Sequence, residues 1–222
     1  MGSDNLFHKR KGKPSNQLNR RTASKEATPV LFIVCEGAKT EPQYFNGLRN
    51  LERLSTINVK VCGDCGSAPI SVVDHALELF ECATKSGEKI EEVFCVFDKD
   101  NHESYFRACA LIEKSRTNGI PITAVTSIPC FEYWILLHFT YHRAPYQGNG
   151  KASIASLVMK DLKPHIAKYE KGMTDVYKLL KPLQADALAN SVTALADMDA
   201  TGQDNPTTQV HLLVSKLLQY AE

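Results

Sequence analysis

The stretch VLFIVCEGAKTEPQYF (residues 30–45) decides the fold, because it joins a strand to a helix through an acidic turn. Its first six residues are apolar and rich in β-branched side chains, which is typical of a strand buried on both faces. Glu36 ends this run. A helical pattern then opens, with Thr40 as the expected N-cap and Pro42 in the first turn. The stretch therefore predicts one strand followed by one helix.

The same alternation recurs three times further along the chain. Apolar runs predict strands at 57–62, 92–97 and 120–126, and periodic segments predict helices from residue 70, over 102–117 and from Pro129. Alternating strands and helices are expected to form an open, mostly parallel sheet covered on both faces. We therefore predict an α/β core over residues 29–142.

The sequence changes character after residue 142. A polar connection at 143–151 leads into segments rich in Ala, Leu and Lys, which predict helices as far as residue 198. A polar loop then precedes a last amphipathic helix, expected over 207–220. We read residues 143–222 as a C-terminal helical extension that packs on the core.

Composition excludes several classes of protein. The 222 residues are 43% hydrophobic and 23% charged, as in soluble globular proteins. No apolar run approaches the roughly 18 residues of a membrane-spanning helix, and the start lacks the pattern of a secretory signal. The seven cysteines are an odd number scattered through apolar runs and loops, which favours a reducing compartment. A cytoplasmic protein is expected.

The first 28 residues are expected to form a basic, disordered arm. The chain carries a net charge of +1, but residues 1–26 hold seven basic side chains against two acidic ones. Such an arm could bind phosphates, with Arg20 and Arg21 as candidate contacts to nucleic acid, or it could be a solvated leader. Both interpretations agree that it has no fold of its own.

Acidic side chains follow two of the predicted strands. Glu36 and Glu41 come after the first strand, and Asp98 and Asp100 end the third, two residues apart and so on one face of an extended chain. Parallel strands bring such ends to one edge of the sheet, where carboxylates could share Mg²⁺ or Mn²⁺. The alternative is that these acids cap helices or bind backbone amides.

Other motifs narrow the chemistry. The chain has no G-x-x-x-x-G-K-[ST] phosphate loop, no G-x-S-x-G and no H-E-x-x-H, so ATP hydrolysis by this chain and a serine nucleophile are disfavoured. Lys39 and Lys99 lie beside the acids and either hold a phosphate or offset the carboxylates. Cys62 and Cys65 have zinc-type spacing without a second pair, and His138 is expected in the core.

Four segments together resemble a known family. Residues 30–45 and VFCVFDKD (93–100) look like the two halves of a Toprim domain, a Glu after one strand and D-x-D after a later one. The segments SIPCFEYWILLHF (127–139) and NPTTQVHLLVSKLL (205–218), with the basic leader, resemble the RloB family. The resemblance covers most of the chain, although residues 143–200 contribute little to it.

The resemblance implies a Toprim-like α/β fold, a Mg²⁺-dependent nuclease centre and a role in bacterial abortive infection against phage. Glu36, Asp98 and Asp100 would be metal and catalytic acids, with Glu41 and Glu132 as accessory acids. It also implies an ATPase partner encoded nearby, and related effectors suggest RNA, including tRNA, as the target.

Two functions stay open on the sequence. The first is a metal-dependent nuclease, in which Glu36 either binds metal or acts as general base. The alternative is a catalytically quiet Toprim-like module that docks on an ATPase or a nucleotide signal. The expected partners are nucleic acid, the ATPase and a second copy of the chain in a homodimer, and no membrane.

Overall fold

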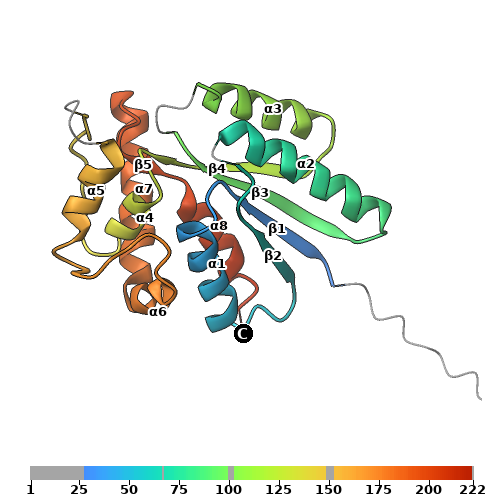
Figure 1. Ribbon diagram of the computed structural model, residues 1–222, viewed down its shortest axis with the longest axis horizontal. Coiled ribbons are helices and arrows are strands. Elements are labelled where there is room, and N and C mark those ends of the chain that lie inside the picture. The colour runs from blue at the N-terminus through green and yellow to red at the C-terminus, as the bar shows by residue number, and fades with distance from the viewer. Residues whose placement is uncertain (1–27, 67, 100–102, 149–152, 222) are drawn as a thin grey trace, which may run out of the picture.

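The computed structural model describes residues 28–66, 68–99, 103–148 and 153–221. Within these ranges five strands form one sheet in the order β2-β1-β3-β4-β5 (Figure 1). The strands are β1 (Val30–Cys35), β2 (Asn58–Cys62), β3 (Ile90–Asp98), β4 (Ile122–Ile128) and β5 (Thr207–Thr208). The first four run parallel, and β5 pairs antiparallel with β4. The predicted α/β class, with its open and mostly parallel sheet, is confirmed.

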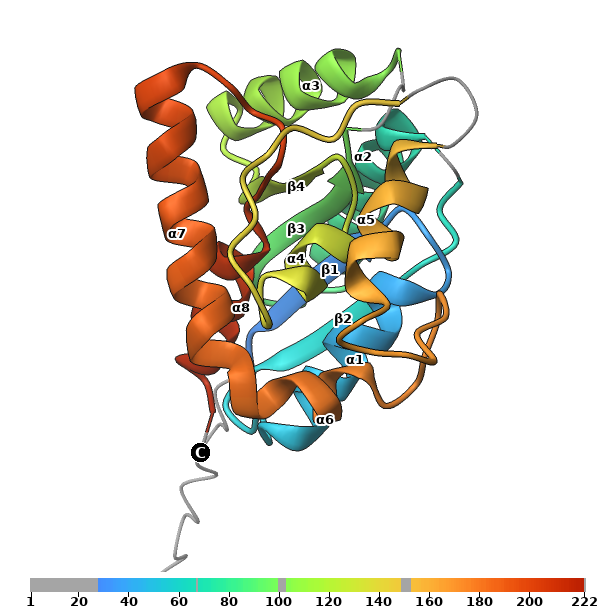
Figure 2. The same ribbon diagram turned by 90° about the vertical axis from the view of Figure 1, so that its left-hand side faces the viewer.

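Helices cover both faces of this sheet. They are α1 (Thr40–Leu51), α2 (Pro69–Lys85), α3 (Tyr105–Thr117), α4 (Glu132–Leu136), α5 (Ile154–Leu162), α6 (Val176–Leu180), the 3₁₀ turn η1 (Lys181–Leu183), α7 (Gln184–Thr201) and α8 (Val210–Leu218). α2 and α3 lie on one face, and α1 and α8 on the other (Figure 1). Next to α1 and α8, helix α4 contacts both α5 and α7 (Figure 2). None of the helices in the described ranges is long and apolar enough to cross a membrane.

Strand β1 shows why the sheet is buried on both sides. Leu31, Ile33 and Cys35 belong to the hydrophobic cluster under α1 and α8, whereas Val30, Phe32 and Val34 belong to the cluster under α2 and α3. Successive side chains of a strand point to opposite faces, so a run that is apolar throughout needs a core on each side. The predicted burial of this strand on both faces is therefore observed.

The C-terminal helices share a core with the sheet. Side chains of α5, α6 and α7 lie in the same hydrophobic cluster as those of α1. The rings of Tyr44 on α1 and Tyr177 on α6 pack edge to face with centroids 5.2 Å apart. A Cβ atom at Gly47 would lie 2.8 Å from the Cβ of Tyr177, so the close approach of these two helices requires a glycine. The helical extension is thus packed directly against the first helix of the core.

The last helix begins later than predicted. It starts at Val210 instead of residue 207, because Thr207 and Thr208 form the edge strand β5 and pair with Ile128 and Ser127. Threonine is β-branched and suits a strand, but two residues are too few to show a strand periodicity in sequence.

Two other helix starts also differ from the prediction. Thr40 is the first residue of α1 and not its N-cap, which is Lys39 and makes no side-chain capping bond. The helix expected from Pro129 begins at Glu132 and spans only five residues. Strand β4 extends to Ile128, beyond the predicted end at residue 126. Residues 129–131 then connect it to the helix, and the amide of Tyr133 donates to the carbonyl of Cys130 at 3.0 Å.

Candidate functional site

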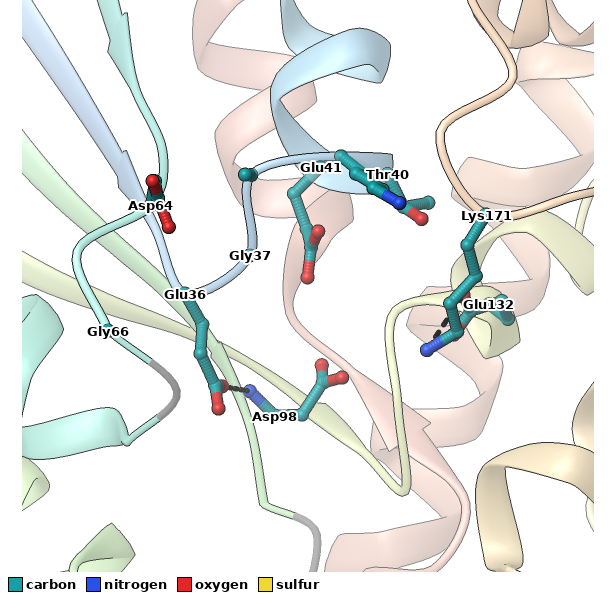
Figure 3. Close-up of a pocket in the computed structure, with 11 residues that line it drawn as sticks. Glu36, Gly37, Thr40, Glu41, Asp64, Gly66, Asp98, Glu132 and Lys171 are labelled. Atoms are coloured by element: carbon teal, nitrogen blue, oxygen red, sulfur yellow. Dashed lines mark hydrogen bonds and ion pairs between the residues drawn. The ribbon is translucent and has the colours of Figure 1, made fainter.

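A pocket of about 460 Å³ opens at the carboxyl ends of β1 and β3, which are neighbours in the sheet (Figure 3). Its charged lining comes from five segments far apart in the sequence. The charged residues are Glu36, Lys39, Glu41, Asp64, Asp98, Glu132 and Lys171. The structure thus brings together four of the predicted site acids and one of the predicted lysines.

Glu36 and Asp98 are held together by the pairing of β1 with β3. The amide of Glu36 donates to the carbonyl of Val96 at 3.0 Å, which extends the ladder one residue beyond β1. In return, the amide of Asp98 donates to Oε2 of Glu36 at 3.1 Å, the contact drawn as a dashed line in Figure 3. Backbone geometry therefore fixes both carboxylates at the floor of the pocket.

Asp98 lies in an environment that disfavours its charged form. The side chain is half-buried at the end of β3. Loss of hydration, reinforced by the negative charges of Glu41, Glu132 and Glu36, raises the pKa of this carboxyl well above its usual value. A carboxyl with three acidic neighbours is a site at which a cation would be strongly favoured.

Glu41 is the second perturbed acid of the pocket. It lies in the first turn of α1 with 8% of its surface exposed, and its side chain points toward Asp98 (Figure 3). Burial, together with the charges of Glu132 and Glu36, raises the pKa of Glu41 to about 7, against the lowering effects of its own backbone hydrogen bond and of Lys171. A group with a pKa near 7 can both accept and release a proton at neutral pH.

Glu132 begins α4 and is only 2% exposed. Its Oε1 lies 3.5 Å from Nζ of Lys171, which reaches the pocket from the connection between α5 and α6. Glu132 therefore faces the strand ends, as the resemblance implied. Its position beside Lys171 gives the acidic pocket a cation from the C-terminal extension.

Lys171 was missed by the sequence reasoning, because it lies in a polar connection that carries no motif. The one local signal is Gly172, which has a φ of +88° and whose Cβ, if present, would lie 3.0 Å from the Cβ of Lys39. A glycine in a left-handed conformation indicates a constrained turn, but it does not tell which pocket the turn approaches.

The two lysines predicted to contact nucleic acid have different surroundings. Lys39 is exposed and lines the pocket. Lys99 does not line it, because its ammonium pairs with Asp204 and lies over the rings of Tyr105 and Phe106, 5.8 and 5.6 Å from their centroids. Within the pocket, only Lys39 of this pair is placed to meet a ligand.

Three predicted site residues lie outside the described residues. They are Asp100 in the second acidic motif and Arg20 and Arg21 in the basic arm. Their roles stay predictions from sequence. His138, in contrast, is buried in the core as predicted, and burial lowers the pKa of its imidazole to about 4.

The side chains present suit a hard divalent cation. In the ranges that the structure describes, no three Asp, Glu, His or Cys side chains are already grouped so as to hold a metal ion. The donor chemistry nevertheless fits, because the available ligands are carboxylate oxygens, which Mg²⁺ prefers. Burial and the neighbouring acids raise the pKa values of Asp98 and Glu41, and a cation among these carboxylates would favour their charged forms. Cys62 and Cys65 are free thiols that form no such group with other described residues.

Comparison with known proteins gives one family. The family model described as RloB-like protein matches residues 31–217, which is most of the chain and includes every described acid of the pocket. Neither the curated proteins nor the solved structures contain a match.

Proposed function

This chain belongs to the RloB-like protein family, and on that premise we propose that it is a Mg²⁺-dependent nuclease with a Toprim-like domain. Its substrate is nucleic acid, and RNA such as tRNA is preferred over DNA. It acts as an abortive-infection effector against phage, together with an ATPase encoded nearby. The family resemblance of the sequence motifs supports the defence role and the RNA preference.

The convergence of Glu36 and Asp98 is the observation that carries this proposal. The backbone amide of Asp98 donates to the carboxylate of Glu36 at 3.1 Å, so the two strand ends lie side by side. Burial, together with the charges of Glu41 and Glu132, raises the pKa of Asp98. Several carboxylates gathered in one partly buried pocket are costly for stability, and functional sites are where such costs occur. A purely structural capping role for Glu36 and Asp98 would not require Glu41 and Glu132 beside them.

The pocket residues divide the chemical tasks of hydrolysis. Carboxylate oxygens of Glu36 and Asp98 would hold Mg²⁺, joined by Asp100 on the sequence pattern. When bound, the ion stabilises the negative charge that develops on the phosphate and makes a bound water more acidic. Glu41 lines the pocket from the first turn of α1, and its carboxylate is placed to accept a proton from the attacking water. Glu132 orients Lys171 through their ion pair.

Cleavage of RNA and DNA by the purified chain tests the proposal, in Mg²⁺ and with or without the ATPase. Asp98→Asn and Glu36→Gln remove a charge with little change of shape, and we expect each to reduce cleavage by roughly 10²–10³-fold. Glu113→Gln is the matched control, because Glu113 is an exposed acid on α3 paired with Arg116 at 3.1 Å. It should cleave like the wild type.

Intact RNA and DNA in the presence of both proteins and Mg²⁺ would remove the nuclease proposal. Equal loss of cleavage in Glu113→Gln and Asp98→Asn would show that the pocket acids have no special role. In either case, binding of the chain to the ATPase or to a nucleotide, measured by calorimetry, would test the alternative of a docking module.

A further inference from the structure

We propose that the exposed ring of Phe106, at the start of α3, is a stacking platform for an unpaired nucleobase. The ligand is a single-stranded segment of nucleic acid that crosses the carboxyl edge of the sheet at β3. The proposal rests on the proposed nuclease function for the identity of this ligand. It adds the class of substrate, because unpaired nucleotides are then bound in preference to a duplex.

Phe106 exposes a large apolar surface to solvent. It is the second residue of α3, and 71% of its surface is exposed. It is the most exposed of the large hydrophobic residues in the described ranges, ahead of Val192 at 56%. Single exposed apolar side chains are common, so the exposure alone does not identify a site. The surroundings of the ring distinguish it.

Aromatic contacts connect this ring to the end of β3. Phe97, the buried residue before Asp98, packs edge to face on Tyr105 with centroids 5.9 Å apart. Tyr105 packs edge to face on Phe106 at 5.3 Å, with their planes at 85°. The exposed ring is therefore held by the strand end that carries a pocket acid. A ring that is already held loses little conformational freedom when a base stacks on it.

Lys99 shows where the platform lies relative to the pocket. It directly follows Asp98, and its amide donates to the carbonyl of Ser127 at 2.9 Å, next to the pairing of β3 with β4. Its ammonium pairs with Asp204 and lies 5.6 Å from the centroid of the Phe106 ring. α3 covers the face of the sheet opposite α1 (Figure 1). The end of β3 thus lies between the acidic pocket and the platform, and a strand that crosses it meets both.

The charges around the ring favour a base over a protein partner. Glu103 and Arg107, which flank Phe106 in the chain, are both exposed. The core of a protein interface is depleted of charged residues, whereas a cation beside an aromatic ring suits the phosphates next to a stacked base. Every base has a π-face, but in a duplex that face is already stacked on its neighbours. The platform therefore fits unpaired nucleotides.

The test is binding of a fluorescein-labelled single-stranded RNA, and of the duplex with the same sequence, to the full-length chain. Fluorescence anisotropy measures it in EDTA, so that no metal-dependent cleavage occurs. Phe106→Ala should weaken binding of the single strand by roughly 5- to 100-fold, the effect of losing one stacked base. Binding of the duplex should stay that of the wild type.

Three further variants show whether the π-face itself is needed. Phe106→Trp keeps a π-face and should bind the single strand at least as tightly as the wild type. Phe106→Leu keeps apolar surface without one and should bind as weakly as Phe106→Ala. Leu212→Ala is the matched control, because Leu212 is an exposed apolar residue on α8, and it should bind like the wild type. Circular dichroism checks that each variant is folded.

Several outcomes would overturn the platform. They are equal affinity of the wild type and Phe106→Ala for the single strand, no binding by the wild type, and wild-type affinity in Phe106→Leu. Light scattering without nucleic acid adds another. An oligomer of the wild type that Phe106→Ala dissociates would make the ring a contact between copies of the chain and not a platform for a base.

Cleavage assays separate the platform from the nuclease. If both exist, Phe106→Ala should raise KM for a single-stranded substrate more than it lowers kcat. Binding of the single strand that depends on Phe106, without any cleavage in Mg²⁺, would contradict the nuclease proposal and leave the platform standing. Cleavage that depends on Asp98, with KM unchanged in Phe106→Ala, would do the reverse.

Discussion

Polar side chains are buried at two places near the carboxyl edge of the sheet, the acidic pocket and a junction formed by Ser127, Ser191, Thr208 and His211. In the junction the groups satisfy one another. Ser127 and Thr208 share a hydrogen bond at 2.9 Å, and Ser191 donates to the carbonyl of Thr208 at 3.0 Å. Oγ of Ser191 also lies 2.8 Å from Nδ1 of His211, whose pKa is lowered by burial. The junction is neutral.

The pocket has the opposite character. Burial, reinforced by the repulsion between its acids, raises the pKa values of Asp98 and Glu41. Neutral, satisfied groups join elements of the fold, here β4, β5, α7 and α8. Charged, unsatisfied groups lower stability unless a ligand binds. The difference separates polar burial that holds the fold from polar burial that serves a ligand.

The comparison between the acidic pocket and the neutral junction predicts its largest effect in the pH dependence of the free energy of unfolding, measured without metal. The pKa of Glu41 is raised in the folded chain to about 7 from an ordinary 4.5, so its contribution to stability is complete below about pH 4.5 and is lost as the pH rises through 7. We expect the free energy of unfolding to fall by up to about 3 kcal/mol over this interval. Urea unfolding at several pH values measures it.

Glu41→Gln should flatten this pH dependence and make the protein more stable than the wild type at pH 8. The control is Glu113→Gln, which changes an exposed acid on α3 and should keep the wild-type slope. A wild-type slope in Glu41→Gln would mean that the repulsion in the pocket does not limit stability.

Addition of Mg²⁺ should remove the same penalty. At a free concentration one hundred times its Kd, a ligand that binds only the folded state stabilises it by about 2.7 kcal/mol. Binding should also release protons near pH 7, because the metal competes with the proton on the pocket acids. Calorimetry in two buffers of different ionisation enthalpy measures this release. Asp98→Asn with an unchanged response to Mg²⁺ would place the ion elsewhere.

A change in the neutral junction should lower stability and spare the pocket. Ser191→Ala leaves His211 and the carbonyl of Thr208 without that partner, and we expect a loss of about 2 kcal/mol. Thermal unfolding detects this loss as a lower midpoint. The response to Mg²⁺ should stay that of the wild type, since the junction makes no part of the pocket lining. A lost response in a folded variant would link the two sites and end the distinction between them.

The smallest loss of stability is expected at a buried pair of side chains that share one hydrogen bond but leave another polar atom without a partner. Tyr44 is buried and donates to Oε1 of Gln184 at 3.1 Å, while Nε2 of Gln184 has no partner in the described part of the chain. Tyr44→Phe should therefore cost about 1 kcal/mol of unfolding free energy. Urea unfolding measures this cost. A loss as large as that of Ser191→Ala would show that the single hydrogen bond between Tyr44 and Gln184 stabilises the fold as much as the fully hydrogen-bonded junction does.

The fold was predictable where one strand or helix is long enough to show its own period. The apolar run at 30–35 and the repeated alternation after it determine the parallel sheet. The two-residue strand β5 could not be predicted, because its formation depends on pairing with Ser127 and Ile128, about 80 residues earlier. The end of β4 likewise depends on strand pairing, because Ser127 pairs with Asp98 of β3 and with Thr208 of β5.

The site was predictable from strand ends but not from the extension. Glu36 and Asp98 come together because they follow neighbouring parallel strands, a relation that apolar runs reveal. Glu132 was identified through the family resemblance, since its own segment gives no chemical signal. Lys171 reaches the pocket through packing of the α5–α6 connection on the core, and no periodicity encodes such tertiary contact. The role of Asp100 as a metal ligand stays a prediction.

The antiparallel pairing of β5 with β4 has a consequence for the order in which the chain is made. Residue 208 pairs with residue 127, so β4 remains an open edge until the chain about 80 residues further on has been made and has folded back. Open strand edges pair readily with other chains. The sheet can therefore be completed only after the segment that follows β4 has been made, and in that interval the nascent protein presents an aggregation-prone strand edge.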